Sequence, residues 1–275
     1  MVIGLGAALA GAVLFGLGAV VQAVAARRGP LLSRLMALVV AMYLVGWLLH
    51  LVSIALVPLY VAQVGTSTSL AFTAFAAAKV VGEPLARRHW VAIAALVAGL
   101  ALLAVAAGPV GHHRFEAPHA LVLVGALVLL LVLGLAAARV PGQRGGVLLG
   151  CVAGVAYAGS PLASRALVGF RWDWPTVVSC LTIGLFGLLG FWLYSLALRR
   201  SAITATTAPL VLLQTVVPAV VGVLAFDDAV RAGWWPVALV GFAVSTAAAV
   251  ALCDAEARLE HLPEHHADPM VGYTP

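Results

Sequence analysis

The sequence predicts an all-α fold, a polytopic membrane helix bundle of about nine transmembrane helices in two inverted-topology repeats. Three observations lead to this prediction. Hydrophobic residues make up 64% of the chain and charged residues only 9%, and the mean hydropathy is +1.12, whereas a soluble domain carries about a quarter charged residues. The apolar residues gather in segments long enough to cross a membrane, and short motifs recur at a nearly constant spacing. The lipid bilayer is therefore an expected partner of the chain.

Each predicted helix is an apolar segment of roughly 20 residues, the length that crosses the hydrocarbon core. The first segment is followed, not preceded, by the basic pair Arg27 and Arg28. A signal peptide has the opposite layout, so we expect this segment to be retained as a span. Most Gly, Pro and charged residues fall in the short connections between segments. The nine expected spans are residues 2–26, 35–57, 59–82, 89–108, 119–138, 146–168, 174–198, 202–225 and 234–253.

The basic residues are divided unevenly between the two sets of connections. With the N-terminus outside, eleven of the 15 lysine and arginine residues lie on the cytoplasmic side and four on the other. This positive-inside bias predicts an external N-terminus and a cytoplasmic C-terminus, in the plasma (inner) membrane of a bacterium. Since the arginines act as topology signals, the net charge of +5 does not indicate a nucleic-acid partner. Residues 254–275 are expected to form a polar, disordered cytoplasmic tail.

Short motifs return after roughly 143 residues, which indicates an internal repeat. This interval contains five expected spans, so the second copy enters the membrane in the opposite sense. Inverted repeats of this kind occur in many secondary transporters, with the substrate site between the halves. We therefore divide the chain into a first repeat of five helices (1–138) and a second of four (139–253). The matching elements are SIAL (53–56) and SLAL (195–198), Gly11 with Gly16 and Gly154 with Gly159, and Glu83–Trp90 and Asp227–Trp234.

Two segments resemble the drug/metabolite transporter (DMT) superfamily, in its EamA-like branch. They are GEPLARRHWVAIAALVAGLALL (82–103) and LQTVVPAVVGVLAFDDAVRAGWWPVALVGFA (213–243). The first is similar to that family's Gly-Glu, basic pair and Gly-rich last helix, and the likeness extends over about residues 2–253. The resemblance implies a permease that moves a small organic solute or metabolite by alternating access. Typical members have ten spans, and the chain is also similar to NIPA-like magnesium transporters, which are described with nine.

Two other functions stay open, namely a magnesium transporter or channel and a non-transporting membrane scaffold. Magnesium favours carboxylate ligands, and no carboxylate lies at mid-span. The sequence holds no Gly-rich phosphate loop and no set of nucleophile, base and orienting residue, so we expect no enzyme activity, no cofactor and no metal site. A small-molecule substrate is the expected partner, and a homodimer is left open.

Polar side chains at membrane depth are costly and tend to face a partner or a cavity. His50 lies within the second span, where it could bind substrate or carry a coupling proton; a hydrogen bond to a neighbouring helix is the alternative. Gln214 lies near the middle of the eighth span, and its amide needs several partners. Helix contacts are the alternative role of the serines and threonines. The expected substrate-binding residues are His50, Trp47, Ser69, Thr73, Tyr157, Ser160, Gln214 and Thr215.

Overall fold

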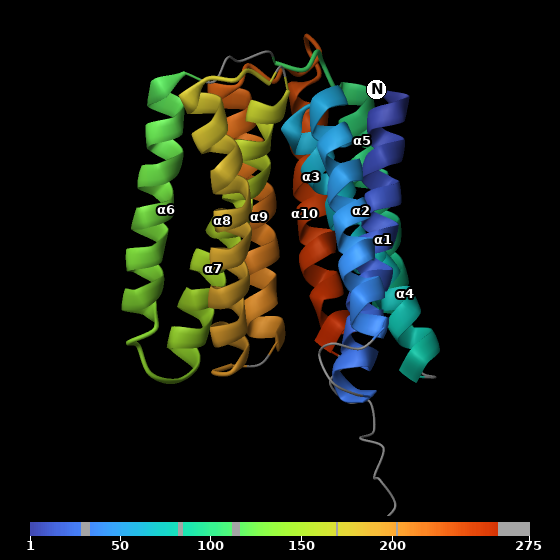
Figure 1. Cartoon of the computed structure of the whole chain (residues 1–275). Helices are drawn as coiled ribbons and strands as arrows, with labels where there is room; N and C mark the ends of the chain where they lie inside the picture. The colour runs from blue at the N-terminus through green and yellow to red at the C-terminus, as the bar shows by residue number, and fades with distance from the viewer. Residues whose placement is uncertain (29–33, 82–84, 112–115, 169, 202, 258–275) are drawn as a thin grey trace, which may run out of the picture.

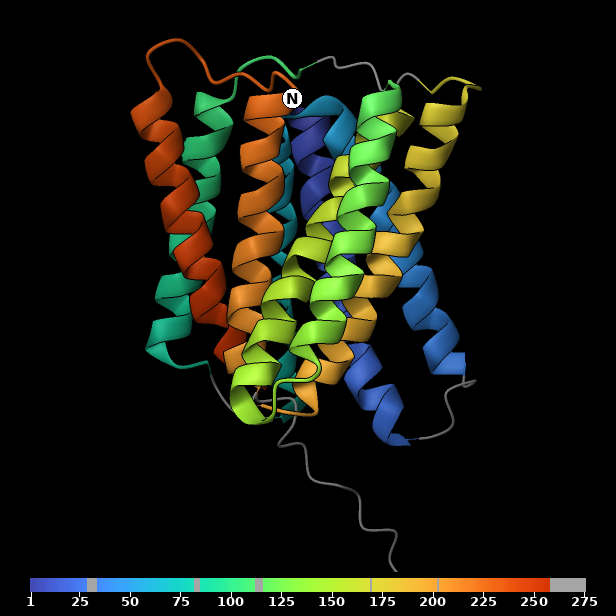
Figure 2. The ribbon, with the colours of Figure 1, turned by 90° about the vertical axis from the view of Figure 1, so that its left-hand side faces the viewer.

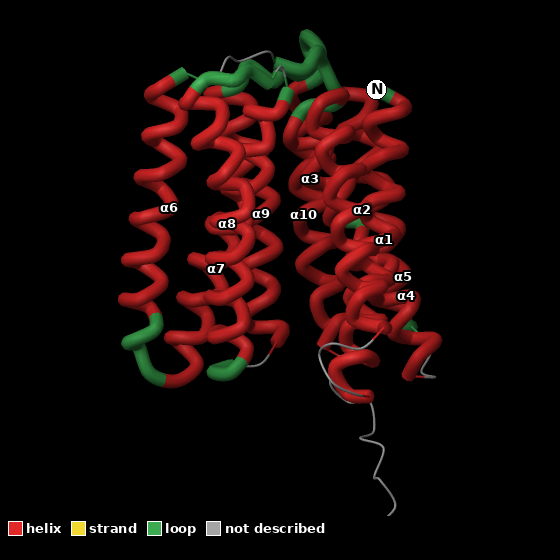
Figure 3. The backbone as a smooth tube through the Cα atoms, in the orientation of Figure 1, coloured by secondary structure: helices red, strands yellow, loops and turns green. Residues whose placement is uncertain are grey.

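A computed structural model describes residues 1–257 except 29–33, 82–84, 112–115, 169 and 202. The described chain is helical almost throughout, and its loops gather at the two ends of the bundle (Figure 3). Within these residues, β-pairing is limited to one isolated bridge between Ala107 and Val230. The helices are α1 (Val2–Arg28), α2 (Arg34–Leu56), α3 (Leu59–Ser67), α4 (Ser69–Val81), α5 (Arg87–Ala106), α6 (Ala117–Ala137), α7 (Gly142–Ser164), the 3₁₀ turn η1 (Arg165–Leu167), α8 (Trp174–Leu198), α9 (Ile203–Ala225) and α10 (Trp235–Ala257).

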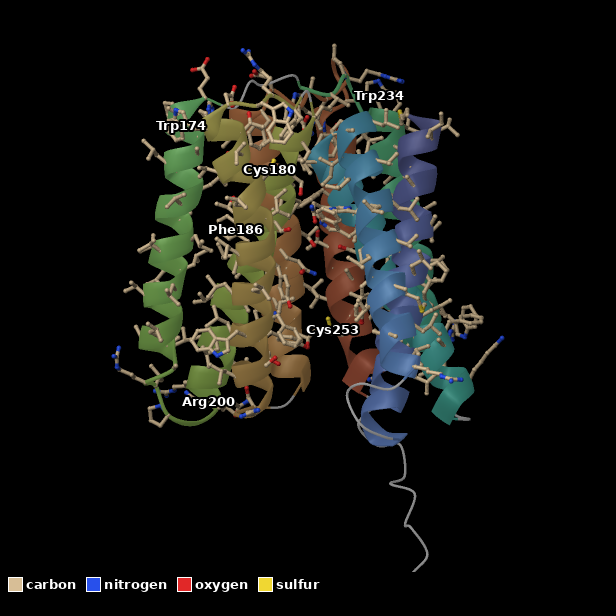
Figure 4. The ribbon with its side chains drawn as sticks, viewed as in Figure 1. Trp174, Cys180, Phe186, Arg200, Trp234 and Cys253 are labelled. Atoms are coloured by element: carbon tan, nitrogen blue, oxygen red, sulfur yellow. The ribbon has the colours of Figure 1, made fainter. Side chains whose placement is uncertain are left out.

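The chain is a multi-pass membrane protein by the length and composition of its helices. Eight of the described helices are long and apolar enough to cross a membrane, and the α3–α4 pair forms one further pass. Successive passes run in alternating directions, so the N-terminus and the end of α10 lie at opposite ends of the bundle (Figure 1). We call these the N-terminal end and the opposite end. Trp174 and Trp234 lie near the N-terminal end and Arg200 near the opposite end (Figure 4).

The expected third span, residues 59–82, is not one continuous helix; this prediction was wrong. It is divided at Thr68 into α3 and α4. The hydroxyls of Thr66, Ser67 and Thr68 donate to the carbonyls of Ala62, Gln63 and Gly65, at 2.9, 2.9 and 2.6 Å. Hydroxyl groups that bond the preceding turn in this way compete with the backbone ladder and bend helices. The expected tail also begins later, because α10 continues to Ala257; residues 258–275 lie outside the described part.

Two helix starts at the N-terminal end are set by local side chains. Asp173 precedes α8, and its carboxylate accepts a hydrogen bond from the Thr176 N–H at 3.0 Å. This N–H lies in the first turn and has no acceptor within the helix. Hydrogen bonds from Thr176, helped by Arg171 at 3.5 Å, hold the pKa of the Asp173 carboxyl below its ordinary value. Before α6, the Glu116 N–H donates to Nδ1 of His119 at 3.2 Å. Both helices also carry a proline in their first turn.

The helices pack in two groups that do not follow the sequence halves. In one group, α1 contacts α2, α3 and α4, while α10 contacts α3, α4 and α5. In the other, α7 contacts α6, α8 and α9, and α6 also contacts α8. The groups meet where α9 contacts α3 and α10 and where α2 contacts α7. Figure 2 shows α5 and α10 side by side at one edge and α6 in front. Thus α6 and α10 each pack against helices of the other sequence half.

A close approach between α5 and α10 depends on glycine. A Cβ atom on Gly99 would meet the Gly241 carbonyl oxygen at 2.7 Å and would also collide with the Ser245 hydroxyl. A Cβ atom on Gly241 would in turn lie 2.9 Å from the Gly99 carbonyl oxygen. Small residues at such contacts allow two membrane helices to approach closely.

We expect Gly99→Leu to separate α5 from α10 and to lower the stability of the protein by about 1–3 kcal/mol or more, because an overpacked contact must move apart. Gly125→Leu in α6 is the control, since a Cβ there meets nothing within 4 Å. Thermal unfolding of both purified variants in detergent measures the difference. Equal stability of the two variants would show that the α5–α10 contact tolerates a large side chain.

Candidate functional site

A cavity of about 460 Å³ lies between the helices. Its lining comes from α1, α2, α3 and α4 on one side and from α7, α8 and α9 on the other. Cavities of this size hold small organic molecules in other proteins. Both sequence halves therefore contribute to one chamber within the membrane-spanning part of the bundle.

Seven of the eight expected site residues line this cavity. The eighth, Thr215, does not line it; its hydroxyl lies 3.2 Å from that of Ser67, which does. Thr215 also donates to the Val211 carbonyl at 2.8 Å, so it acts as a helix contact behind the wall. The structure brings the set together but does not test whether it binds substrate. The seven lining residues are Trp47, His50, Ser69, Thr73, Tyr157, Ser160 and Gln214.

Two glutamine side chains face the cavity without a protein partner among the described residues. Gln63 of α3 is 6% exposed, and its amide nitrogen makes no hydrogen bond there. Gln214 of α9 lines the same cavity, and its side chain likewise makes no hydrogen bond to the described part of the chain. A buried donor without an acceptor costs about 1–3 kcal/mol. Within the described chain, Gln63 thus holds an unpartnered, buried donor beside the cavity, and Gln214 holds an unpartnered amide in its lining.

The hydrogen bonds of Thr66 define the state of the His50 ring. Thr66 has one hydroxyl proton, and its oxygen lies 2.9 Å from the Ala62 carbonyl and 2.8 Å from Nδ1 of His50. Because a carbonyl can only accept, Thr66 donates to Ala62 and accepts from His50. The Nδ1 atom then carries a proton, and in the neutral form of the ring Nε2 is an acceptor. His50 is 9% exposed and lines the same cavity as the two glutamines.

Aromatic side chains form much of the apolar lining. Phe15 and Trp47 come from the first sequence half, and Tyr157 and Tyr194 from the second. The Tyr157 ring lies against Gly190, where a Cβ atom would approach the ring at 2.9 Å. The Tyr194 hydroxyl is 2.6 Å from that of Thr207. These rings offer flat apolar faces to a ligand.

No Asp, Glu, Lys or Arg is among the residues that line the cavity. The described residues also contain no group of three or more His, Cys, Asp or Glu side chains that could hold a metal ion. Any ligand charge would therefore have to be compensated by neutral dipoles.

A buried ion pair lies at the N-terminal end of the bundle. Nη2 of Arg165 in η1 donates to both carboxylate oxygens of Asp228 at 2.8 Å. The same carboxylate accepts the backbone N–H of Leu59 at 2.6 Å and that of Gly111 at 3.0 Å. Leu59 is the first residue of α3, so Asp228 satisfies a helix donor from a distant part of the chain. We call this set of Arg165, Asp228, Leu59 and Gly111 the clamp.

Backbone hydrogen bonds extend the clamp. The connection after α5 pairs with the connection after α9: Gly108 donates to Ala229 at 3.1 Å, and Arg231 donates to Ala106 at 2.9 Å. The Tyr60 hydroxyl donates to the Ala229 carbonyl at 3.0 Å. Gly111 must be glycine, because a Cβ atom there would collide with the Phe226 carbonyl oxygen. Helices of both sequence halves are thus held together at this end.

Sequence reasoning missed the clamp and part of the lining. Arg165 falls near the end of the expected span 146–168 and Asp228 in the connection after 202–225, and neither is among the expected site residues. Of the polar lining residues, it missed Gln63, Thr66, Ser67, Tyr194 and Thr207. The signal for Thr66 and Ser67 was the run of four hydroxyl residues at 66–69, unusual within an apolar span.

No protein-family model matches the chain, and no curated protein or solved structure matches it either. The resemblance to the drug/metabolite transporter superfamily therefore stays a hypothesis carried by residues 82–103 and 213–243.

We expect Asp228→Asn to destabilise the protein by about 3–5 kcal/mol, because it leaves the buried Arg165 without a counter-charge. Asp227→Asn is the matched control. Asp227 is exposed and has a φ of 57°, a conformation that Asn also tolerates. The double variant Arg165→Met/Asp228→Asn should recover part of the loss, because it removes both charges. Thermal unfolding in detergent compares the three; equal stability of Asp228→Asn and Asp227→Asn would contradict a structural role for the ion pair.

Proposed function

We propose that the chain is a secondary transporter that moves a small organic solute by alternating access through the cavity. The observation that carries this proposal is the cavity itself, lined by neutral polar groups of both sequence halves and positioned beneath the clamp. A carrier needs a site that two parts of the protein enclose and can expose to either side in turn. A membrane scaffold needs no such chamber.

The packing partners of the helices support an inverted repeat. α1 contacts α2 and α4, and its counterpart α7 contacts α8 and α9. α5 packs against α10 and α3 against α9. These contacts are expected if a two-fold axis relates each of these helices to its counterpart in the other repeat. α1 and α7 also run in opposite directions (Figure 1). The glycine pairs do not follow this relation, because Gly11 faces α2 whereas Gly154 faces α9.

The clamp favours a conformation that is closed at the N-terminal end. Tyr194 lies four residues before the end of α8, and Thr207 lies four residues after the start of α9. At about 1.5 Å per residue, both are roughly 6 Å from the helix termini at the opposite end of the bundle, and Gln63 and Ser160 are equally close to the termini at the N-terminal end. The clamp holds the N-terminal end together, whereas no such set of buried interactions occurs among the described residues at the opposite end. We infer that the cavity communicates with the opposite end while the clamp is intact.

The arginine distribution supports a cytoplasmic location for the opposite end, so the proposed state faces inward. We propose the plasma (inner) membrane of a bacterium as the location. The tryptophans at the N-terminal end and Arg200 at the opposite end are typical of the two membrane interfaces (Figure 4). Magnesium transport finds less support, because among the described lining residues the side chains that could receive the cation carry hydroxyl, amide and imidazole groups and no carboxylate.

A thiol probe in the cavity tests alternating access without knowledge of the substrate. Gly187 of α8 lines the cavity, and a Cβ there meets nothing within 4 Å, so Gly187→Cys should fit. It is introduced after Cys151, Cys180 and Cys253 have been replaced by alanine. Gly184→Cys is the control, because that position is equally open but does not line the cavity.

We expect an impermeant maleimide to label Gly187→Cys from the cytoplasmic face only, in vesicles of known orientation. Adding Asp228→Asn should raise labelling from the external face by about tenfold or more, since about 1.4 kcal/mol of lost clamp stability changes an equilibrium tenfold. Gly184→Cys should react slowly in every case. Equal labelling from both faces with the clamp intact would indicate a channel, and no labelling from either face would contradict the proposed site.

A further inference from the structure

The chemistry of the cavity lining restricts the class of substrate, on the assumption that the cavity is the transport site proposed here. No charged side chain of the described residues lines it, and the ion pair of Arg165 with Asp228 is internally neutral and does not line it. A charged molecule would give up its hydration without gaining a counter-ion. The composition of the lining therefore favours an uncharged molecule.

The start of α4 is a backbone feature that could receive an anion, because Ser69 lines the cavity and helix N-termini attract negative groups. However, the N–H groups of Ala71 and Phe72 already donate to the Thr68 carbonyl, at 2.9 and 3.4 Å. The interruption at Thr68 is a single residue, so few donors of α4 are released. Few backbone N–H groups there could replace the water molecules that hydrate a carboxylate.

The unpaired glutamine amides indicate which polar group the molecule carries. The Gln63 nitrogen is buried at the cavity without an acceptor in the described chain, and Gln214 approaches from the other sequence half. A carboxamide presents a donor and an acceptor side by side, and it pairs best with a planar group that does the same, such as another amide or the edge of a heterocycle. Nε2 of His50 adds a further acceptor.

The aromatic side chains indicate the rest of the molecule. Phe15 and Trp47 on one side and Tyr157 and Tyr194 on the other provide flat apolar surfaces. Aromatic rings pack favourably against other rings in offset or edge-to-face arrangements. A volume of about 460 Å³ suits a compound of one or two rings better than a long chain or a large drug.

We infer that the substrate is an uncharged, planar, amide-bearing compound, a carboxamide or lactam-type heterocycle, recognised by Gln63 and Gln214 and enclosed by the aromatic lining. The same lining disfavours amino acids with two ionised groups and cationic drugs, because neither would find a counter-ion among the described lining residues.

Benzamide, benzoate and benzamidine test this inference, because the three have nearly the same shape and differ in charge. Isothermal titration and thermal unfolding of the purified full chain in nanodiscs measure their binding. Benzamide should bind roughly tenfold or more tightly than either ion. Gln63→Leu and Gln214→Leu should each weaken benzamide binding roughly fivefold or more, as expected for a lost hydrogen bond. Gln143→Leu is the control, since Gln143 is exposed at the start of α7.

The variant Gln63→Glu should reverse the binding preference between benzamide and benzamidine. At alkaline pH its carboxylate should move the preference from benzamide to the cation benzamidine. If Gln63→Leu fails to fold, as judged by gel filtration, Gln214→Leu and the three wild-type affinities still decide the question. Equal or tighter binding of benzoate or benzamidine, no binding of benzamide at millimolar concentration, or benzamide binding unchanged in the Leu variant that folds would overturn the inference.

This experiment and the thiol probe fail independently. Alternating labelling of Gly187→Cys without a preference for benzamide would retain the transporter and reject the substrate class. Benzamide binding that depends on the two glutamines, with no alternation of labelling, would retain the binding site and reject transport by alternating access.

Discussion

The carboxylate of Asp228 is the point at which distant parts of the chain meet. It accepts from Arg165 and from the amides of Leu59 and Gly111, so it joins η1, the start of α3 and the connection after α5 to the connection after α9. Burying both charges costs free energy, and the pair compensates only while every donor is in place. Such an arrangement adds little net stability but strongly favours one geometry. That is the property that the proposed closure would need, since it must also open.

The cavity below the clamp combines neutral polar groups with aromatic walls in a region shielded from bulk water. In such surroundings each unpaired amide or imidazole nitrogen has a larger energetic effect than in water, so few groups suffice for recognition. The first half contributes His50 and Gln63, and the second contributes Tyr157 and Gln214. Relative movement of the two halves would therefore change every side of the site at once, which links substrate contact to the clamp.

The amino-acid sequence predicted the helices well because the bilayer demands apolar segments of fixed length, and the observed ends differ from the expected ones by a few residues. It failed at Thr68, since hydropathy over a long segment does not register hydroxyls that bond the preceding turn. Trp47, His50 and Gln214 were chosen for their depth within the expected spans, and all three line one cavity. Thr215 was chosen in the same way but does not line it, because depth does not reveal how a helix is rotated about its axis. The Arg165–Asp228 pair was not predictable, because it requires knowledge of which helix ends meet in space.

The distances between spin labels at both ends of the bundle in liposomes would test the central claim most directly. One pair joins the exposed Trp172 and Ala232 positions at the N-terminal end, and the other joins Leu35 and Gln143 at the opposite end. The account predicts that breaking the clamp lengthens distances in the first pair and shortens them in the second within the same population. A change confined to the N-terminal end, or none at either end, would contradict a clamp that governs alternating access.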